Sequence, residues 1–137
     1  MQVKDVMSDR VIRVSPDSSL QEIAIAMRDG DLGSIPVSED DKLIGMITDR
    51  DIVVRGLTGT LETHLMTARD VMSPNIKYCY EDQPLEEVLR NMADERIRRL
   101  PVVSREKRLV GIVSLGDLAK ESPNKKTGET LEEITKR

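Results

Sequence analysis

The stretch Gly45-Met46-Ile47-Thr48-Asp49-Arg50-Asp51-Ile52 decides the fold, because the chain carries it twice. Its second copy is Gly111-Ile112-Val113-Ser114-Leu115-Gly116-Asp117-Leu118. In each copy a short apolar run meets a [Ser/Thr]-x-x-Asp pattern, which is typical of the first turn of a helix. The sequence therefore predicts one strand-to-helix junction in each half of a repeated chain.

The repeat extends on both sides of this stretch. Asp5-Val6-Met7-Ser8 recurs as Asp70-Val71-Met72-Ser73, and Pro36-Val37 recurs as Pro101-Val102, both at the same offset. One inserted residue in the following turn then brings the two copies of the first stretch into register. We predict repeats over residues 1–57 and 69–120, a linker over 58–68 and a polar tail over 121–137. In that tail Leu131 and Ile134 could mark a frayed or surface-docked terminal helix, or a dimer or partner contact.

Each copy is expected to fold as strand, helix, two strands and helix. Apolar residues at positions i, i+3, i+4 and i+7 predict a helical face of Leu20, Ile23, Ala24 and Met27, and another of Leu85, Val88, Leu89 and Met92. One copy is too small to bury its apolar face alone, so we predict an α+β fold in which two pseudo-symmetric β-α-β-β-α repeats pack sheet to sheet. The expected strands cover 11–14, 35–37, 43–47, 76–79, 100–103 and 109–113, and second helices begin near Asp49 and Leu115.

Composition excludes several classes of protein. The 137 residues include no Phe or Trp, and Tyr78 and Tyr80 are the only aromatic residues, so the core is expected to consist of aliphatic side chains and Met. The net charge of −4 and the lack of an aromatic platform argue against a nucleic-acid partner. No apolar run approaches a membrane span, and the charged amino end lacks the apolar stretch of a signal peptide. Cys79 is the only cysteine, and we expect a cytoplasmic protein without a membrane partner.

Catalytic and metal-binding residues are not predicted. His64 lies in the linker and has no counterpart in the other copy, and Cys79 lies in an expected strand, where an inert buried thiol is the expectation. The sequence contains no Cys/His cluster with metal-ligand spacing and no Gly-rich phosphate loop. The protein is therefore expected not to be an enzyme; a nucleotide hydrolase of unrecognised type is the last alternative.

The two [Ser/Thr]-x-x-Asp patterns have two interpretations. Thr48 and Ser114 could cap the helices, with Asp51 and Asp117 completing a capping box. Alternatively, the helix starts could bind an anion through free N–H groups while the aspartates accept ribose hydroxyls. Arginine suits phosphate oxygens; Arg50 lies inside the first of these turns, and Arg98 and Arg99 lie just before the expected strand that begins at Leu100.

As a set, these motifs resemble the CBS-domain family over roughly Val3 to Lys120. The resemblance rests on the repeated Asp-Val-Met-Ser, on the two strand-to-helix stretches, on Gly33-Ser34-Ile35-Pro36-Val37 and on Ile97-Arg98-Arg99-Leu100-Pro101-Val102-Val103. It implies a stand-alone pair of repeats, called a Bateman module, which commonly forms a homodimer. It further implies clefts between the repeats that take AMP, ADP or ATP, or less commonly S-adenosylmethionine or NAD, with no required cofactor.

The resemblance also implies crosswise ligand sites, in which the [Ser/Thr]-x-x-Asp of one copy faces strand ends of the other. Only the first cleft collects arginines, so it is predicted to bind phosphate better, and the second to be weak or empty. The implied function is a non-catalytic nucleotide sensor that regulates an unknown protein partner; the alternative is a ligandless dimeric scaffold. The first cleft would use Thr48, Arg50 and Asp51 with Tyr80, Arg98, Arg99 and Leu100, and the second Ser114 and Asp117 with Ser15, Pro16, Ser34 and Ile35.

Overall fold

A computed structural model describes residues 1–59 and 61–121, and these residues form two compact units. The first-repeat unit is the continuous segment Ile12–Ile76. The second-repeat unit combines Met1–Val11 with the described residues from Lys77 to Glu121. The expected terminal stripe of Leu131 and Ile134 lies outside the described residues.

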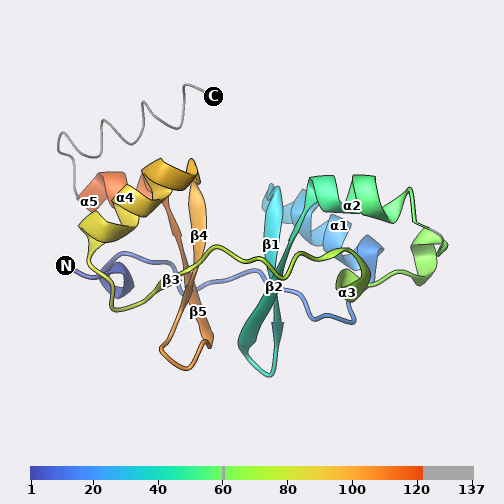
Figure 1. Ribbon diagram of the computed structural model, residues 1–137, viewed down its shortest axis with the longest axis horizontal. Coiled ribbons are helices and arrows are strands. Elements are labelled where there is room, and N and C mark those ends of the chain that lie inside the picture. The colour runs from blue at the N-terminus through green and yellow to red at the C-terminus, as the bar shows by residue number, and fades with distance from the viewer. Residues whose placement is uncertain (60, 122–137) are drawn as a thin grey trace. The chain divides into compact units, whose positions relative to one another are not determined.

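The first-repeat unit is built on an antiparallel pair of strands that leads directly into a helix (Figure 1). The turn between the strands consists of Asp40 and Asp41, both with positive φ, as a tight hairpin turn requires. Helices α1 and α2 contact each other and also contact the strands. The elements are α1 (Leu20–Gly30), β1 (Ser34–Glu39), β2 (Lys42–Thr48), α2 (Asp49–Gly56), η2 (Thr63–Leu65) and α3 (Ala68–Val71).

The second-repeat unit has the same plan with one more strand. Its sheet has the order β3-β4-β5, in which β3 runs parallel and β5 antiparallel to β4. Helices α4 and α5 contact each other, as α1 and α2 do in the other unit. The elements are η1 (Val3–Asp5), β3 (Cys79–Tyr80), α4 (Leu85–Glu95), β4 (Arg99–Val103), β5 (Leu109–Ser114) and α5 (Leu115–Glu121).

Each unit has its own core of aliphatic and sulfur-containing side chains, as the composition predicted. On α1 the predicted face is confirmed at Leu20, Ile23 and Met27, but the inclusion of Ala24 was wrong because this residue is exposed. On α4 all four predicted residues are buried.

The first strand of each copy is shorter than predicted. In the segment 11–14 only Val14 pairs, through a parallel bridge to Val37. The Val14 amide donates to Pro36 O (3.1 Å) and the Ser38 amide donates to Val14 O (3.0 Å), and pairing ends there. In the second copy the strand covers Cys79–Tyr80 instead of 76–79. The apolar pattern therefore located these segments but overestimated how far their backbones pair.

The two Asp-Val-Met-Ser motifs are exchanged between the copies. Ser8, near the amino end, exchanges two 2.9 Å backbone hydrogen bonds with Ile112 of β5. Ser73 of the second motif makes the equivalent pair with Met46 of β2, at 2.8 and 3.0 Å. The compact units therefore do not coincide with the sequence repeats 1–57 and 69–120, because each sheet is completed by the motif that opens the other repeat.

Glycines make this exchange possible. A Cβ atom at Gly111 would lie 2.5 Å from Met7 Sδ, and one at Gly45 would lie 2.7 Å from Met72 Sδ. Both distances are far below van der Waals contact, so a side chain at either position would push the neighbouring motif away. The glycine in each strand-to-helix stretch is thus explained by close packing against a methionine.

Candidate ligand site

Both [Ser/Thr]-x-x-Asp patterns form reciprocal capping boxes. At α2 the Asp51 amide donates to Thr48 Oγ1 (3.0 Å) and the Thr48 amide donates to Asp51 Oδ2 (2.9 Å). At α5 the Asp117 amide donates to Ser114 Oγ (3.1 Å) and the Ser114 amide donates to Asp117 Oδ2 (3.0 Å). The capping interpretation is therefore confirmed at both junctions. Each box uses one carboxylate oxygen, Oδ2.

The start of α2 does not offer free backbone N–H groups to an anion. The Asp49 amide donates to Gly33 O (3.0 Å), and the Arg50 amide donates to Asp49 Oδ1 (2.8 Å). The Asp51 amide is used by the capping box. A phosphate bound near this junction would therefore have to be held by side chains, because the first three amides of the helix already have acceptors.

The side chains of three predicted phosphate contacts could hold a phosphate in this way. The side chains of Arg50, Arg98 and Arg99 are exposed, and none forms an ion pair or a side-chain hydrogen bond with another described residue. Many other arginines of the described chain are engaged: Arg13 with Asp41, for example, and Arg105 with Asp82. An arginine without a carboxylate partner keeps its full donor set for an anion.

Strand register brings part of the predicted site together within each unit. Ser34 at the start of β1 lies opposite Thr48 at the end of β2. Arg99 at the start of β4 lies opposite Ser114 at the end of β5, and the Leu115 amide donates to Arg98 O (2.8 Å). Each unit thus joins a capping box to the first residues of its own neighbouring strand. The crosswise combination of residues from both units stays a prediction.

Three predicted contacts lie near the strand ends that are opposite to Arg99 and Ser34: Tyr80, Ser15 and Pro16. Tyr80 pairs with Val103, four residues along β4 from Arg99, a distance of roughly 13 Å at the usual strand rise. Ser15 and Pro16 follow Val14, which pairs with Val37 near the end of β1, whereas Ser34 begins that strand. A compact ligand would therefore contact one end or the other, and only an elongated ligand would contact both.

Two predicted contacts have side chains inside the cores. Ile35 is fully buried in the first-repeat unit, and Leu100 is 5% exposed in the second-repeat unit. Pro16 is also buried. A ligand would reach Ile35 and Leu100 through backbone atoms, because their side chains pack against other core residues.

Tyr80 belongs to a cluster of aromatic and charged side chains that the sequence did not reveal. The Arg105 guanidinium lies 4.1 Å from the centroid of the Tyr80 ring and donates to both carboxylate oxygens of Asp82, at 2.8 and 3.0 Å. The Tyr78 ring meets Tyr80 edge-on at 5.7 Å, and a side-chain hydrogen bond with Tyr78 raises the pKa of Tyr80. Because Arg105 covers one face of the Tyr80 ring, a base could stack on that face only after Arg105 moves.

The cysteine and the histidine, which were not expected to be catalytic, differ in their exposure to solvent. Cys79 is buried, and desolvation raises the pKa of its thiol to about 12. His64 is exposed beside Glu62, with 3.4 Å between Nδ1 and Oε2. Within residues 1–59 and 61–121 no group of three or more His, Cys, Asp or Glu side chains is arranged to hold a metal ion. No helix in this part of the chain is long and apolar enough to cross a membrane.

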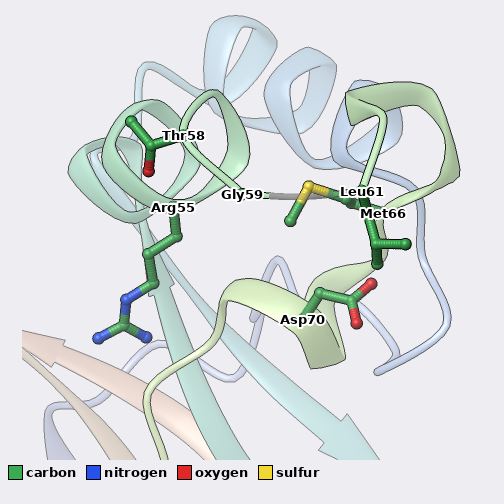
Figure 2. A pocket seen from close by; sticks show the side chains of 6 residues that line it. All are labelled: Arg55, Thr58, Gly59, Leu61, Met66 and Asp70. Atoms are coloured by element: carbon green, nitrogen blue, oxygen red, sulfur yellow. The ribbon is translucent and has the colours of Figure 1, made fainter.

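A hollow of about 380 Å³ lies in the first-repeat unit, and none of the predicted site residues lines it. Figure 2 shows Arg55 and Asp70 on opposite sides of it. Arg55 is held in place because its Nη1 donates to the backbone oxygens of Val71 (3.1 Å) and Met72 (3.4 Å). The remaining lining residues are Thr58, Gly59, Leu61 and Met66.

Comparison with known proteins gives matches over nearly the whole chain. Residues 3–56 and 68–124 each match the family model described as the CBS domain. Hypoxic response protein 1 of Mycobacterium tuberculosis is 39% identical over 121 residues, which is 88% of this chain and 84% of that protein. Its crystal structure, with two coordinated zinc ions, has a TM-score of 0.77 over 90% of this chain and all of that chain, at 37% identity.

Two further solved structures contain adenosyl ligands. The CBS domain pair of protein MJ0100, in complex with 5'-methylthioadenosine and S-adenosyl-L-methionine, has a TM-score of 0.71 at 28% identity and covers 88% of this chain and 94% of its own. CBSX2 in complex with AMP has a TM-score of 0.76 at 24% identity, with the same two coverages, and supports the fold alone. These matches confirm the predicted α+β fold built from two repeats.

Proposed function

Because the chain belongs to the CBS-domain family, we propose that it is a non-catalytic regulatory module that binds an adenine nucleotide with residues from both repeats. The ligands named for the MJ0100 pair and for CBSX2 share an adenosyl group, which supports this class of ligand. AMP, ADP and ATP are the first candidates. We further propose that the module acts as a cytosolic homodimer on a protein partner.

The observation that carries the proposal is the state of the three arginines. Arg50, Arg98 and Arg99 are exposed and have no carboxylate partner among the described residues. Next to Arg50, Asp51 commits Oδ2 to the capping box and keeps Oδ1 for a ribose hydroxyl. An anion and a diol held in this way correspond to the phosphate and ribose of a nucleotide.

The turn of the second capping box contains no arginine of its own, and Arg98 and Arg99 at the start of the neighbouring strand are proposed to act crosswise with Asp51. In the turn that contains Asp117, Leu115 and Gly116 stand where the first turn has Asp49 and Arg50. We therefore propose that nucleotide binding depends on Asp51 and not on Asp117, although the two residues have the same structural role.

Thermal denaturation with AMP, ADP, ATP, S-adenosylmethionine and NAD tests the proposal. At a hundredfold excess over Kd, a ligand specific for the folded state adds about 2.7 kcal/mol to the free energy of unfolding. Asp51→Asn and Asp117→Asn should each weaken a cap, which costs about 0.5–2 kcal/mol. Only Asp51→Asn should also abolish the shift caused by the nucleotide.

The arginines are tested with a matched control. Arg98→Ala combined with Arg99→Ala should abolish the nucleotide shift and leave the unliganded melting temperature nearly unchanged, because both side chains are exposed. Arg90→Ala removes an exposed arginine from α4 and should leave the shift intact. Equal losses in the control and in the double variant would reject the assignment of Arg98 and Arg99.

A ligandless scaffold remains the competing function, and one observation favours it. The capping boxes account fully for the repeated hydroxyl and carboxylate pattern without any ligand. If none of the five compounds shifts the melting temperature of the folded protein, the scaffold replaces the nucleotide sensor.

A further inference from the structure

The hollow of the first-repeat unit is lined by one basic and one acidic side chain that do not pair with each other. Arg55 and Asp70 both line it, and neither forms an ion pair with another residue of the described chain. Figure 2 shows the thioether of Met66 between the two charged side chains. At about 380 Å³ the hollow has the size of a small-molecule site, which is usually about 300–1,000 Å³. This arrangement suits a ligand that carries both charges and an apolar group.

The Arg55 side chain is fixed in position and still has donors for a ligand. Its Nη1 donates to the backbone oxygens of Val71 (3.1 Å) and Met72 (3.4 Å), which holds the guanidinium at the carboxyl end of α3. These two bonds use Nη1 alone. Because a guanidinium has five N–H donors, Nε and Nη2 remain for the two oxygens of a carboxylate. The side chain is exposed, so a ligand can reach it from solvent.

The Asp70 side chain has one oxygen in use and one that can accept from a ligand. Its Oδ2 accepts from the Thr67 amide (2.9 Å) and from the Thr67 hydroxyl (3.4 Å), within the capping box of α3. Its Oδ1 accepts from no other residue of the described chain, so it can accept from an ammonium group. Asp70 directly precedes Val71, to which Arg55 donates, so the two charged groups flank the same turn of α3.

The apolar surface of the hollow depends on Met66 and on the lack of a side chain at Gly59. Met66 is only 5% exposed and belongs to the core of the unit, yet it also lines the hollow. Gly59 has no positive φ, so its backbone conformation does not require glycine. A Cβ atom there would lie 3.1 Å from the backbone oxygen of Arg55 and 3.5 Å from Met66 Cε. A side chain at this position would therefore crowd α2 and contact Met66, and glycine leaves the Met66 surface open.

The second repeat indicates that the fold does not require this pair of charges. Asp5 stands where the first repeat has Asp70, and it accepts from the Gln2 amide (2.8 Å) as Asp70 accepts from the residue three positions before it. In the register of the two strand-to-helix stretches, Glu121 stands where the first repeat has Arg55. A carboxylate cannot donate to backbone oxygens, so the anchored arginine is particular to the first repeat.

We infer that the hollow binds a free α-amino acid with an aliphatic side chain. The α-carboxylate binds Arg55, the α-ammonium group binds Oδ1 of Asp70, and the side chain packs on Met66 and Leu61. Both α groups are charged at neutral pH. A simple anion would also face Asp70 and a simple cation would also face Arg55, so a ligand with both charges is preferred to either. This inference goes beyond the proposed nucleotide function and does not depend on it, because none of the predicted nucleotide contacts lines the hollow.

Titration with L-leucine, followed by NMR of the chain labelled with ¹³C at its methionine methyl groups, tests the site. The Met66 signal is identified by its loss in Met66→Leu, and L-leucine should shift it in a saturable way. N-acetyl-L-leucine lacks the ammonium charge and L-leucinamide lacks the carboxylate, so each should bind about tenfold more weakly or worse. This comparison uses the unmodified chain and does not depend on how substitutions affect folding. A Met66 signal that L-leucine does not shift, or that all three compounds shift with equal affinity, overturns the inference.

Matched variants test the two charged contacts separately. Asp70→Asn removes the negative charge and keeps an oxygen for the cap of α3, and it should weaken L-leucine binding by about tenfold. Asp5→Asn makes the same change in the corresponding turn of the second-repeat unit and should leave the affinity unchanged. Arg55→Gln should weaken binding as Asp70→Asn does, and its Met66 signal without L-leucine shows whether the unit is folded. Undiminished affinity in Asp70→Asn, or an equal loss in Asp5→Asn, overturns the inference.

Discussion

Replacing Gly111 by alanine should destabilise the second-repeat unit, and the structure sets the size of the loss. The new Cβ would lie 2.5 Å from Met7 Sδ and 2.9 Å from the Ser8 backbone oxygen. The Met7 side chain can move, but the Ser8 oxygen accepts from the Ile112 amide and is held by that pair. Overpacking lowers the free energy of unfolding by about 1–3 kcal/mol. Alanine restricts the unfolded chain more than glycine does, and this raises the free energy of unfolding by about 0.4–1 kcal/mol. We expect a net loss of about 1–2 kcal/mol.

The two tyrosines allow the stability of the second-repeat unit to be measured separately. Tyr78 and Tyr80 both belong to the second-repeat unit and the chain contains no Trp, so tyrosine fluorescence during urea unfolding follows that unit alone. Gly111→Ala should lower the urea midpoint seen by fluorescence.

Two other glycines serve as controls for the expected loss of stability. Gly45→Ala should have a smaller effect, because its closest contact is the flexible end of Met72 and the Ser73 oxygen is 3.2 Å away. Gly116→Ala, in the first turn of α5, meets only Ser114 Oγ at 3.6 Å and should stabilise, since alanine favours helix. An unchanged or raised midpoint for Gly111→Ala would show that residues 7 and 8 do not pack on β5.

Two further predictions concern titratable groups. The Cys79 thiol, with its pKa raised to about 12 by burial, should resist alkylation at mildly alkaline pH and react at once in concentrated urea; rapid reaction in the folded protein would contradict its burial. The hydrogen bond from Arg105 holds the pKa of Asp82 below the ordinary value of a carboxyl group, so the pair stabilises the fold above that ordinary value and the contribution disappears as the pH falls through the lowered pKa. The difference in urea midpoint between the unmodified chain and Asp82→Asn should therefore be constant near neutrality, vanish in strong acid, and be absent throughout in an Arg105→Ala background.

Local patterns in the sequence predicted the local structure well. The helical faces, the two hairpins and both capping boxes depend on residues close together in the chain, and their spacing carries the information. The same reasoning misjudged Ala24, since a small apolar residue at the edge of a stripe can face solvent without cost. It also could not find the cluster of Tyr80, Asp82 and Arg105. That cluster depends on the parallel register of β3 and β4, which no short-range pattern encodes.

The sequence repeat identified two similar motifs but not which sheet each one joins. Both copies read Asp-Val-Met-Ser, and both glycine-containing strands can accept a methionine, so the pattern fits either pairing. In the structure the sheet of the first-repeat unit is completed from within the same continuous segment, because Ser73 lies 27 positions after its partner Met46 (73 − 46). The second-repeat unit is completed by Ser8, 104 positions before Ile112 (112 − 8). Contacts between residues this distant cost more chain entropy to form, so two halves with nearly the same sequence pattern differ in contact order. The continuous first-repeat unit is consequently the half that can fold from local contacts, and the second half depends on the amino end of the chain.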